Sequence, residues 1–260
     1  MPLAAYFDAS GHEDDQKVVV VAGFVATPEM WLEFDSQWKA RLAQDGIKYF
    51  HAVEFAHSNK QFEGWREQRA KRELLLENLM DIIKANVSRK FVSAVIIEAL
   101  NENMTAETKE KLHINAYSLA GRTCAGRLRA WQDRERWTTV PELIFEDGDK
   151  GKGLLRTALL RDGFSEPIFR PKINTPAPDE LIREGLTPLQ AADWLAYEMF
   201  LACRDQRENR WPFSQFLTTP GDMGVYLARD IERLEALLNA PADVAVSPEY
   251  WEELKLRQEE

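Results

Sequence analysis

A short apolar run near the N-terminus ends abruptly at a carboxylate, and this run limits the folds open to the chain. Residues 3–7 have the composition of a β-strand, Asp8 follows them, and Ser10 and Gly11 turn the chain. A second β-rich run, VVVVAGFVA at residues 18–26, comes after a short polar segment, so the two predict a hairpin. A carboxylate on a buried strand is costly without a cation, a proton or several donors. Asp8 is therefore either a functional residue or the cap of this turn.

Strand and helix patterns alternate along the rest of the chain. Thr27 and Pro28 begin a helix whose aromatic stripe belongs to the core, and residues 49–55 form a short, irregular apolar piece. Further strands are expected at 91–100, 140–145 and 167–173, and further helices at 65–85, 108–131, 225–238, from Thr187 and from Ser247. The alternation predicts an α/β fold in which helices cover a mixed sheet. We expect one domain over 1–260, with a helical insertion at about 28–88 and a C-terminal helical extension at about 205–260.

The composition is that of an ordinary globular protein. Hydrophobic residues make up 45% of the 260 residues and charged residues 29%, which excludes disordered and fibrous classes. The N-terminus lacks signal-peptide features and no apolar run could span a bilayer, so we expect a cytoplasmic protein without membrane contact. The net charge of −10 argues against nucleic acid bound over the whole surface but allows a local basic groove. Cys124 and Cys203 lack metal-site spacing and are expected to be free thiols.

A second carboxylate interrupts the inward face of a late helix. Asp193 shares that face, at helical spacing, with apolar residues at three positions: Leu189, Ala196 and Phe200. Two alanines precede Asp193, so the helix can approach the sheet closely and bring the carboxylate to a strand end. In the alternative interpretation, Gln190 and Tyr197 satisfy Asp193 locally within the helix.

Acidic residues also follow the strand predicted at 140–145. Strand alternation places Glu146 on one face and Asp147 on the other, so either acid could face a site, and Asp149 follows. The sequence DGDKGKG lacks the residues of a calcium-binding EF-hand loop and those of a phosphate-binding P-loop. The segment is therefore either part of an acidic site or a turn that caps the next helix.

Three acids from distant parts of the chain suit a divalent metal. Magnesium and manganese prefer oxygen ligands and usually keep several waters, so a few carboxylates and a substrate phosphate suffice. Two such ions about 4 Å apart can activate water and stabilise the leaving oxygen of a phosphodiester. His51 and Glu54 form an HxxE pair without a second histidine, so Glu54 is only a secondary metal candidate.

Four motifs together resemble the domain-of-unknown-function 3800 family, which is related to ribonuclease H-like folds. They are YFDASG, FHAVEF, LIFEDGD and LQAADWLAYE, and they touch most of residues 3–200. The resemblance implies a ribonuclease H-like mixed central sheet with helices on both faces and a carboxylate cluster for divalent metal. Asp8, Glu146 and Asp193 match the family's acidic positions. Ala9 replaces the glutamate that often follows the first aspartate, and Asp147 and Asp149 are the alternatives to Glu146 at the later acidic position.

These patterns lead to one prediction of function. We expect a nuclease dependent on Mg²⁺ or Mn²⁺, with Asp8, Glu146 and Asp193 as catalytic residues and metal ligands. The reserve ligands are Asp147, Asp149 and Glu54, and the expected substrate contacts are Lys150, Lys152, His51 and Gln190. The basic residues of 150–172 would bind the nucleic-acid backbone, although solvated helix faces explain them equally well. The alternatives are a non-catalytic ribonuclease H-like module of a bacterial or phage defence or toxin-related system, with a protein partner or as a homo-oligomer, and a small-molecule phosphohydrolase.

Overall fold

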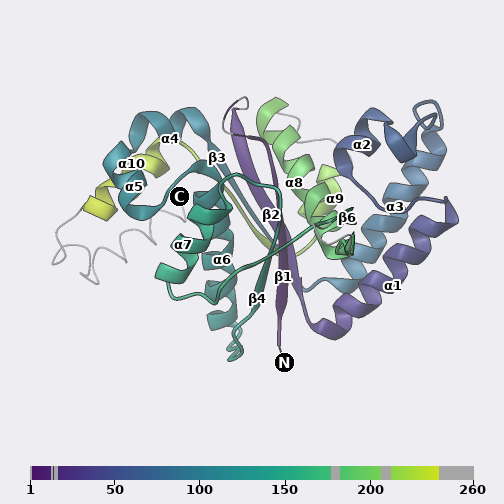
Figure 1. The fold of residues 1–260 in the computed structure, drawn as a ribbon, viewed down its shortest axis with the longest axis horizontal. Coiled ribbons are helices and arrows are strands. Elements are labelled where there is room, and N and C mark those ends of the chain that lie inside the picture. The colour runs from purple at the N-terminus through teal and green to yellow at the C-terminus, as the bar shows by residue number, and fades with distance from the viewer. Residues whose placement is uncertain (1, 13, 15–16, 177–181, 206–211, 240–260) are drawn as a thin grey trace.

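The second strand is buried along its whole length, so the sheet must be covered on both faces. All nine residues of β2 are buried, which a strand with one solvated face could not achieve. The computed structural model describes residues 2–12, 14, 17–176, 182–205 and 212–239. Three layers result, with helices on each side of a sheet that is seen nearly edge-on in Figure 1.

The central sheet has six strands in the order β5-β4-β1-β2-β3-β8. β1 and β2 are antiparallel, as are β2 and β3, whereas the other three neighbouring pairs are parallel. The strands of this sheet are β1 (Ala4–Ser10), β2 (Val18–Ala26), β3 (Arg89–Ile96), β4 (Glu142–Glu146), β5 (Ile168–Arg170) and β8 (Gly221–Tyr226). A separate two-stranded ribbon joins β6 (Thr175–Pro176) to β7 (Ile182–Arg183). The predicted α/β fold with a mixed, helix-covered sheet is confirmed.

Each face of the sheet has its own hydrophobic core and its own helices. One core joins the sheet to α1 (Pro28–Gln44), α2 (Ala52–His57), η1 (Lys60–Phe62), α3 (Arg69–Asn86), α8 (Thr187–Asp205) and α9 (Phe213–Leu217). The other core joins it to α4 (Ile97–Asn103), α6 (Ala116–Arg134), α7 (Lys152–Arg161) and α10 (Ala228–Asn239), with α5 (Ala106–Leu112) nearby. None of the described helices combines the length and apolar character needed to cross a membrane.

Several elements differ from the sequence predictions. The helix expected at 108–131 is two helices, because His113 adopts a left-handed φ of 55° and Asn115 starts α6 with a capping box. The strand expected at 91–100 ends at Ile96, where α4 begins, and the segment expected to be irregular contains α2.

The regions predicted as an insertion and as a C-terminal extension contain helices and, within their described residues, one strand. Residues 28–88, expected to be a helical insertion, hold α1, α2, η1 and α3. The expected C-terminal extension is not purely helical, because β8 pairs with β3 and completes the sheet. The helix expected from Ser247 lies outside the described residues. Cys124 is buried, Cys203 is half-buried, and among the described residues neither forms a disulfide, in agreement with the prediction.

We predict that Gly23→Ala is strongly destabilising, whereas Gly153→Ala is not. A Cβ added to Gly23 would lie 1.9 Å from the carbonyl oxygen of Tyr6 on the neighbouring strand, so the backbones of β1 and β2 would have to separate. Overpacking typically costs about 1–3 kcal/mol, and a clash with backbone puts Gly23→Ala at the upper end of this range. Gly153 lies in α7 with open space around it, so alanine there should raise the free energy of unfolding by up to about 1 kcal/mol. Urea unfolding of the two variants measures the difference, and an unchanged midpoint for Gly23→Ala would contradict it.

Candidate functional site

Asp8 and Glu146 lie side by side where two parallel strands end. In the pairing of β1 with β4, Tyr6 is opposite Ile144 and Phe7 is opposite Phe145, so the next residue on each strand is an acid. Ile144 belongs to the core beneath α8 and Phe145 to the core on the other face. Because side chains alternate along a strand, Asp8 and Glu146 both project toward the α8 face.

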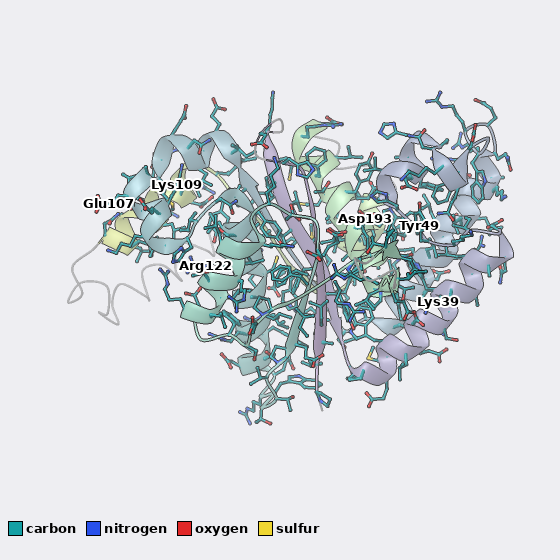
Figure 2. All side chains as sticks on the ribbon, in the orientation of Figure 1. Lys39, Tyr49, Glu107, Lys109, Arg122 and Asp193 are labelled. Atoms are coloured by element: carbon teal, nitrogen blue, oxygen red, sulfur yellow. The ribbon has the colours of Figure 1, made fainter. Side chains whose placement is uncertain are left out.

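Asp193 reaches the same strand ends from α8. It is only 5% exposed, and its Oδ2 accepts a hydrogen bond of 2.7 Å from the backbone N–H of Ala52, at the start of α2. Ala191 and Ala192 are fully buried, so small side chains line the approach of the helix to the core. Figure 2 shows Asp193 in the interior of this helical layer, close to the sheet.

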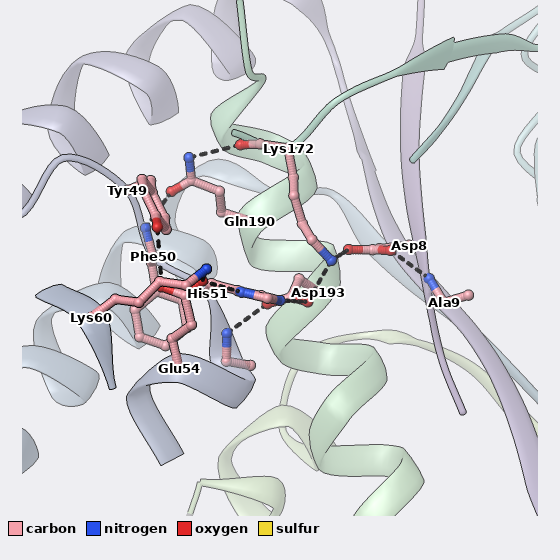
Figure 3. Close-up of polar contacts among 11 residues, drawn as sticks. Asp8, Ala9, Tyr49, Phe50, His51, Glu54, Lys60, Lys172, Gln190 and Asp193 are labelled. Atoms are coloured by element: carbon pink, nitrogen blue, oxygen red, sulfur yellow. Dashed lines mark hydrogen bonds and ion pairs between the residues drawn. The ribbon is translucent and has the colours of Figure 1, made fainter. Parts of the chain in front are cut away.

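A lysine joins the two aspartates directly. The Nζ atom of Lys172 lies 2.8 Å from Oδ2 of Asp8 and 2.8 Å from Oδ1 of Asp193, as Figure 3 shows. The other oxygen of Asp8 accepts a bond of 2.7 Å from the backbone N–H of Ala9. The sequence identified Lys172 only as one member of a basic segment. The available signal was its place two residues beyond β5, which puts it on the same side of an extended chain as Arg170.

Burial and ion pairing have opposite effects on the pKa values of Asp8 and Lys172. Burial raises the pKa of Asp8 to about 8, against the opposing effect of Lys172, while Asp193 and Glu146 add to the rise. Burial by itself would lower the pKa of Lys172, but Asp193 and Asp8 together outweigh it and raise that pKa. The ammonium group therefore stays protonated and serves as the counter-ion of the two acids.

A cleft of about 460 Å³ is lined by Asp8, Lys172 and Asp193. Four carboxylates line this cleft, namely those of Asp8, Glu146, Asp149 and Asp193, together with three of the four histidines: His12, His51 and His57. Burial raises the pKa of Glu146 and also that of Asp149. The structure thus brings together the three acids that the sequence predicted as catalytic residues.

Glu54 lies behind the cleft and positions His51. Its carboxylate accepts from the hydroxyl of Tyr49 at 3.1 Å and from Nζ of Lys60 at 2.7 Å, and it contacts Nδ1 of His51 at 3.0 Å. Burial would raise the pKa of Glu54, but hydrogen bonds from His51 and Lys60 more than offset this and lower it. The Nε2 atom of His51 faces Asp193, 3.7 Å from Oδ1.

Four other predicted site residues do not line this cleft. Asp147 forms ion pairs with Lys152 and Arg183 outside the cleft. Lys150 forms an ion pair of 2.8 Å with Asp14. Lys150 lines a smaller neighbouring cavity of about 290 Å³, which shares His12 and Asp149 with the cleft. The amide of Gln190 is buried. It accepts from Trp38 Nε1 at 2.9 Å and the Phe50 N–H at 2.8 Å, and donates to the Lys172 carbonyl at 3.1 Å. Gln190 is therefore a structural link rather than a substrate contact.

The lysine also determines how a metal would fit. Within the part of the chain that the structure describes, no three His, Cys, Asp or Glu side chains are arranged to hold a metal ion. Asp8 and Asp193 nevertheless offer two carboxylate oxygens to one shared cation. Magnesium needs only one or two carboxylates in addition to waters and substrate phosphate. The acids therefore fit a divalent cation at the position of the Lys172 ammonium group.

The chain was compared with protein-family models, with curated proteins and with solved structures. None of the three comparisons found a match.

We predict that Lys172→Met lowers the free energy of unfolding by about 3 kcal/mol at pH 8, because it leaves two buried carboxyls without a counter-ion. Lys152→Met is the matched control. It also removes one lysine bonded to an aspartate, but this lysine is 51% exposed and its loss should cost less than about 1 kcal/mol. Urea unfolding measures both values, and equal losses would contradict the role assigned to Lys172.

The loss caused by Lys172→Met should depend on pH. The native pKa of Asp8 is already raised to about 8 from an ordinary value of 3.8, and removal of the lysine raises it further. Below about pH 7 the native states of both proteins keep this proton, so the gap in stability between them should be constant. Above pH 8 the wild type releases the proton and Lys172→Met keeps it, so the stability of the variant goes on falling. Unfolding at pH 6, 8 and 9.5 should therefore show a gap that widens only at the higher values, and a gap that stays constant through pH 9.5 would show that the lysine does not lower the pKa of Asp8.

Proposed function

We propose that this protein is a divalent-metal-dependent nuclease that hydrolyses phosphodiester bonds of RNA or DNA. The observation that carries the proposal is the convergence of Asp8, Glu146 and Asp193 on one cleft, although they come from two strands and a helix that are far apart in the sequence. A ribonuclease H-like fold related to the domain-of-unknown-function 3800 family is part of the same proposal. The mixed sheet, the helices on both faces and the acids at strand ends support it.

The charge of the cleft supports metal dependence. Four carboxylates line it against two cationic side chains, Lys172 and Arg204, and Arg204 is itself bonded to Asp205 at 2.7 Å. A phosphodiester anion entering such a cleft meets net repulsion unless a cation accompanies it. Catalysis by these acids alone is therefore disfavoured, and a Mg²⁺ or Mn²⁺ ion resolves the conflict.

The roles follow from where each side chain lies. Asp8 and Asp193 would hold the metal, with Glu146 as a further ligand from the same cleft wall. When bound, such a metal supplies an activated water and stabilises the charge on the leaving oxygen. His51, held by Glu54 through Nδ1, presents Nε2 beside Asp193, and as the imidazolium it would donate a hydrogen bond from Nε2 to a substrate phosphate there.

One observation favours a second candidate function. Lys172 already places a positive charge between both aspartates, which is what a fold that has lost its catalytic metal would need for stability. A non-catalytic interaction module would show no metal-dependent rise in melting temperature and no cleavage, and it would form a complex with a protein partner. Metal-dependent stabilisation that is lost in Asp8→Asn would exclude this candidate.

We predict that Asp8→Asn reduces cleavage by at least about 100-fold, because loss of a direct ligand should cost more than the 10–100-fold typical of groups that only orient ligands. Asp147→Asn is the matched control, since that acid is a near neighbour whose oxygens bond to Lys152 and Arg183. It should retain activity within about 3-fold of the wild type.

The assay uses single-stranded, double-stranded and hybrid nucleic acid with Mg²⁺ or Mn²⁺, and EDTA should abolish cleavage. Circular dichroism confirms that both variants are folded. Cleavage that persists unchanged in Asp8→Asn would exclude this mechanism.

A further inference from the structure

The ammonium group of Lys172 stands where a bound cation would stand between Asp8 and Asp193. We infer that Lys172 is an exchangeable internal counter-ion that competes with a divalent cation for the oxygens of these two aspartates. The inference rests on the proposed metal-dependent function, and it names the residue that sets metal affinity.

The distances make the two cations mutually exclusive. Nζ lies 2.8 Å from one oxygen of each aspartate, whereas magnesium binds carboxylate oxygens at about 2.1 Å. A divalent ion in contact with both oxygens would therefore occupy nearly the same position as Nζ. The carboxylates need to close by only about 0.7 Å each on a cation of that radius, so their present spacing already suits a metal once the ammonium has left.

The lysine can leave without moving the chain. Its backbone carbonyl is held separately, by a hydrogen bond of 3.1 Å from Nε2 of Gln190, and Gln190 is buried. The lysine side chain is 16% exposed and lines the cleft, so rotation of its flexible stem carries the ammonium into that space. Glu146 lines the same cleft and can receive the ammonium, as can a substrate phosphate.

The consequence is a site that always contains a cation. Without metal, Lys172 prevents repulsion between two buried carboxylates. Each metal ion that binds must then displace an existing ion pair, so the lysine lowers the affinity for metal. Removing the lysine should therefore weaken the metal-free protein and strengthen metal binding.

The test measures binding of Mn²⁺ alone, from the electron paramagnetic resonance signal of the free ion. Lys172→Met should bind Mn²⁺ at least about 10-fold more tightly than the wild type, which is the lower end of coupling between charges in direct contact. Lys152→Met removes the same charge from a lysine that contacts neither aspartate, and its affinity should stay within about 2-fold of the wild type. Saturating Mn²⁺ should also raise the melting temperature of Lys172→Met more than that of the wild type.

A second measurement uses the unmodified protein and does not depend on the folding of a variant. Acetic anhydride labels free amines, and mass spectrometry reads the extent of labelling at each lysine. Labelling of Lys172 should rise several-fold when Mn²⁺ is added, because the ammonium moves from between the carboxylates into the cleft. Labelling of Lys152, which is already exposed, should not change.

The outcomes separate this inference from the proposed function. Equal Mn²⁺ affinity in the wild type and Lys172→Met, or unchanged labelling of Lys172 at saturating Mn²⁺, overturns the inference and leaves the metal site intact. Absence of Mn²⁺ binding in both proteins overturns the inference together with metal dependence. Tighter binding by Lys172→Met without any nuclease activity supports the inference and counts against the proposed function.

Discussion

The site depends on one positive charge placed between two buried negative ones. Asp8 and Asp193 are 3% and 5% exposed, so neither carboxylate can be neutralised by bulk water. Two ionised carboxylates so close together and so poorly solvated would force one of them to take a proton. The ammonium of Lys172 opposes this effect, although the pKa of Asp8 stays above its ordinary value, and it ties together the end of β1, the segment after β5 and α8. The same contacts therefore join three separate elements of the fold at the site.

The register of the sheet explains why these groups meet on one face. β1, β4 and β5 are parallel neighbours, so their carboxyl ends lie at the same edge. Glu146 pairs with Arg170, and Lys172 lies two residues further along. The backbone of Lys172 therefore continues from β5, the strand next to β4. Asp8 lies on β1, on the other side of β4, so the long lysine side chain crosses the end of β4 to reach it. A shorter residue at position 172 could not span that distance.

Local pattern was enough to predict the acids but not their partner. Asp8 ends an apolar strand and Asp193 interrupts an apolar helix face, and both features are visible within a few residues. The choice between Glu146 and Asp147 needed the pairing of β4 with β1, which the sequence of β4 alone cannot fix. Lys172 contacts residues 164 and 21 positions away, so the one local indication of its role is its place two residues beyond β5. The contacts of Gln190 were not predicted from the sequence for the same reason, because its partners Trp38 and Phe50 come from a distant part of the chain.

The segment between β2 and β3 does more than cover one face of the sheet. Its backbone N–H groups at Phe50 and Ala52 donate to Gln190 and Asp193, which lie one turn apart on α8. Gln190 also holds the backbone of Lys172, so one helix fixes both the insertion and the segment after β5. Asp193 is thereby anchored through one oxygen by a neutral donor, while its other oxygen faces the cation. The backbone around these oxygens is therefore held independently of the cation, a condition that the proposed exchange of one cation for another would require.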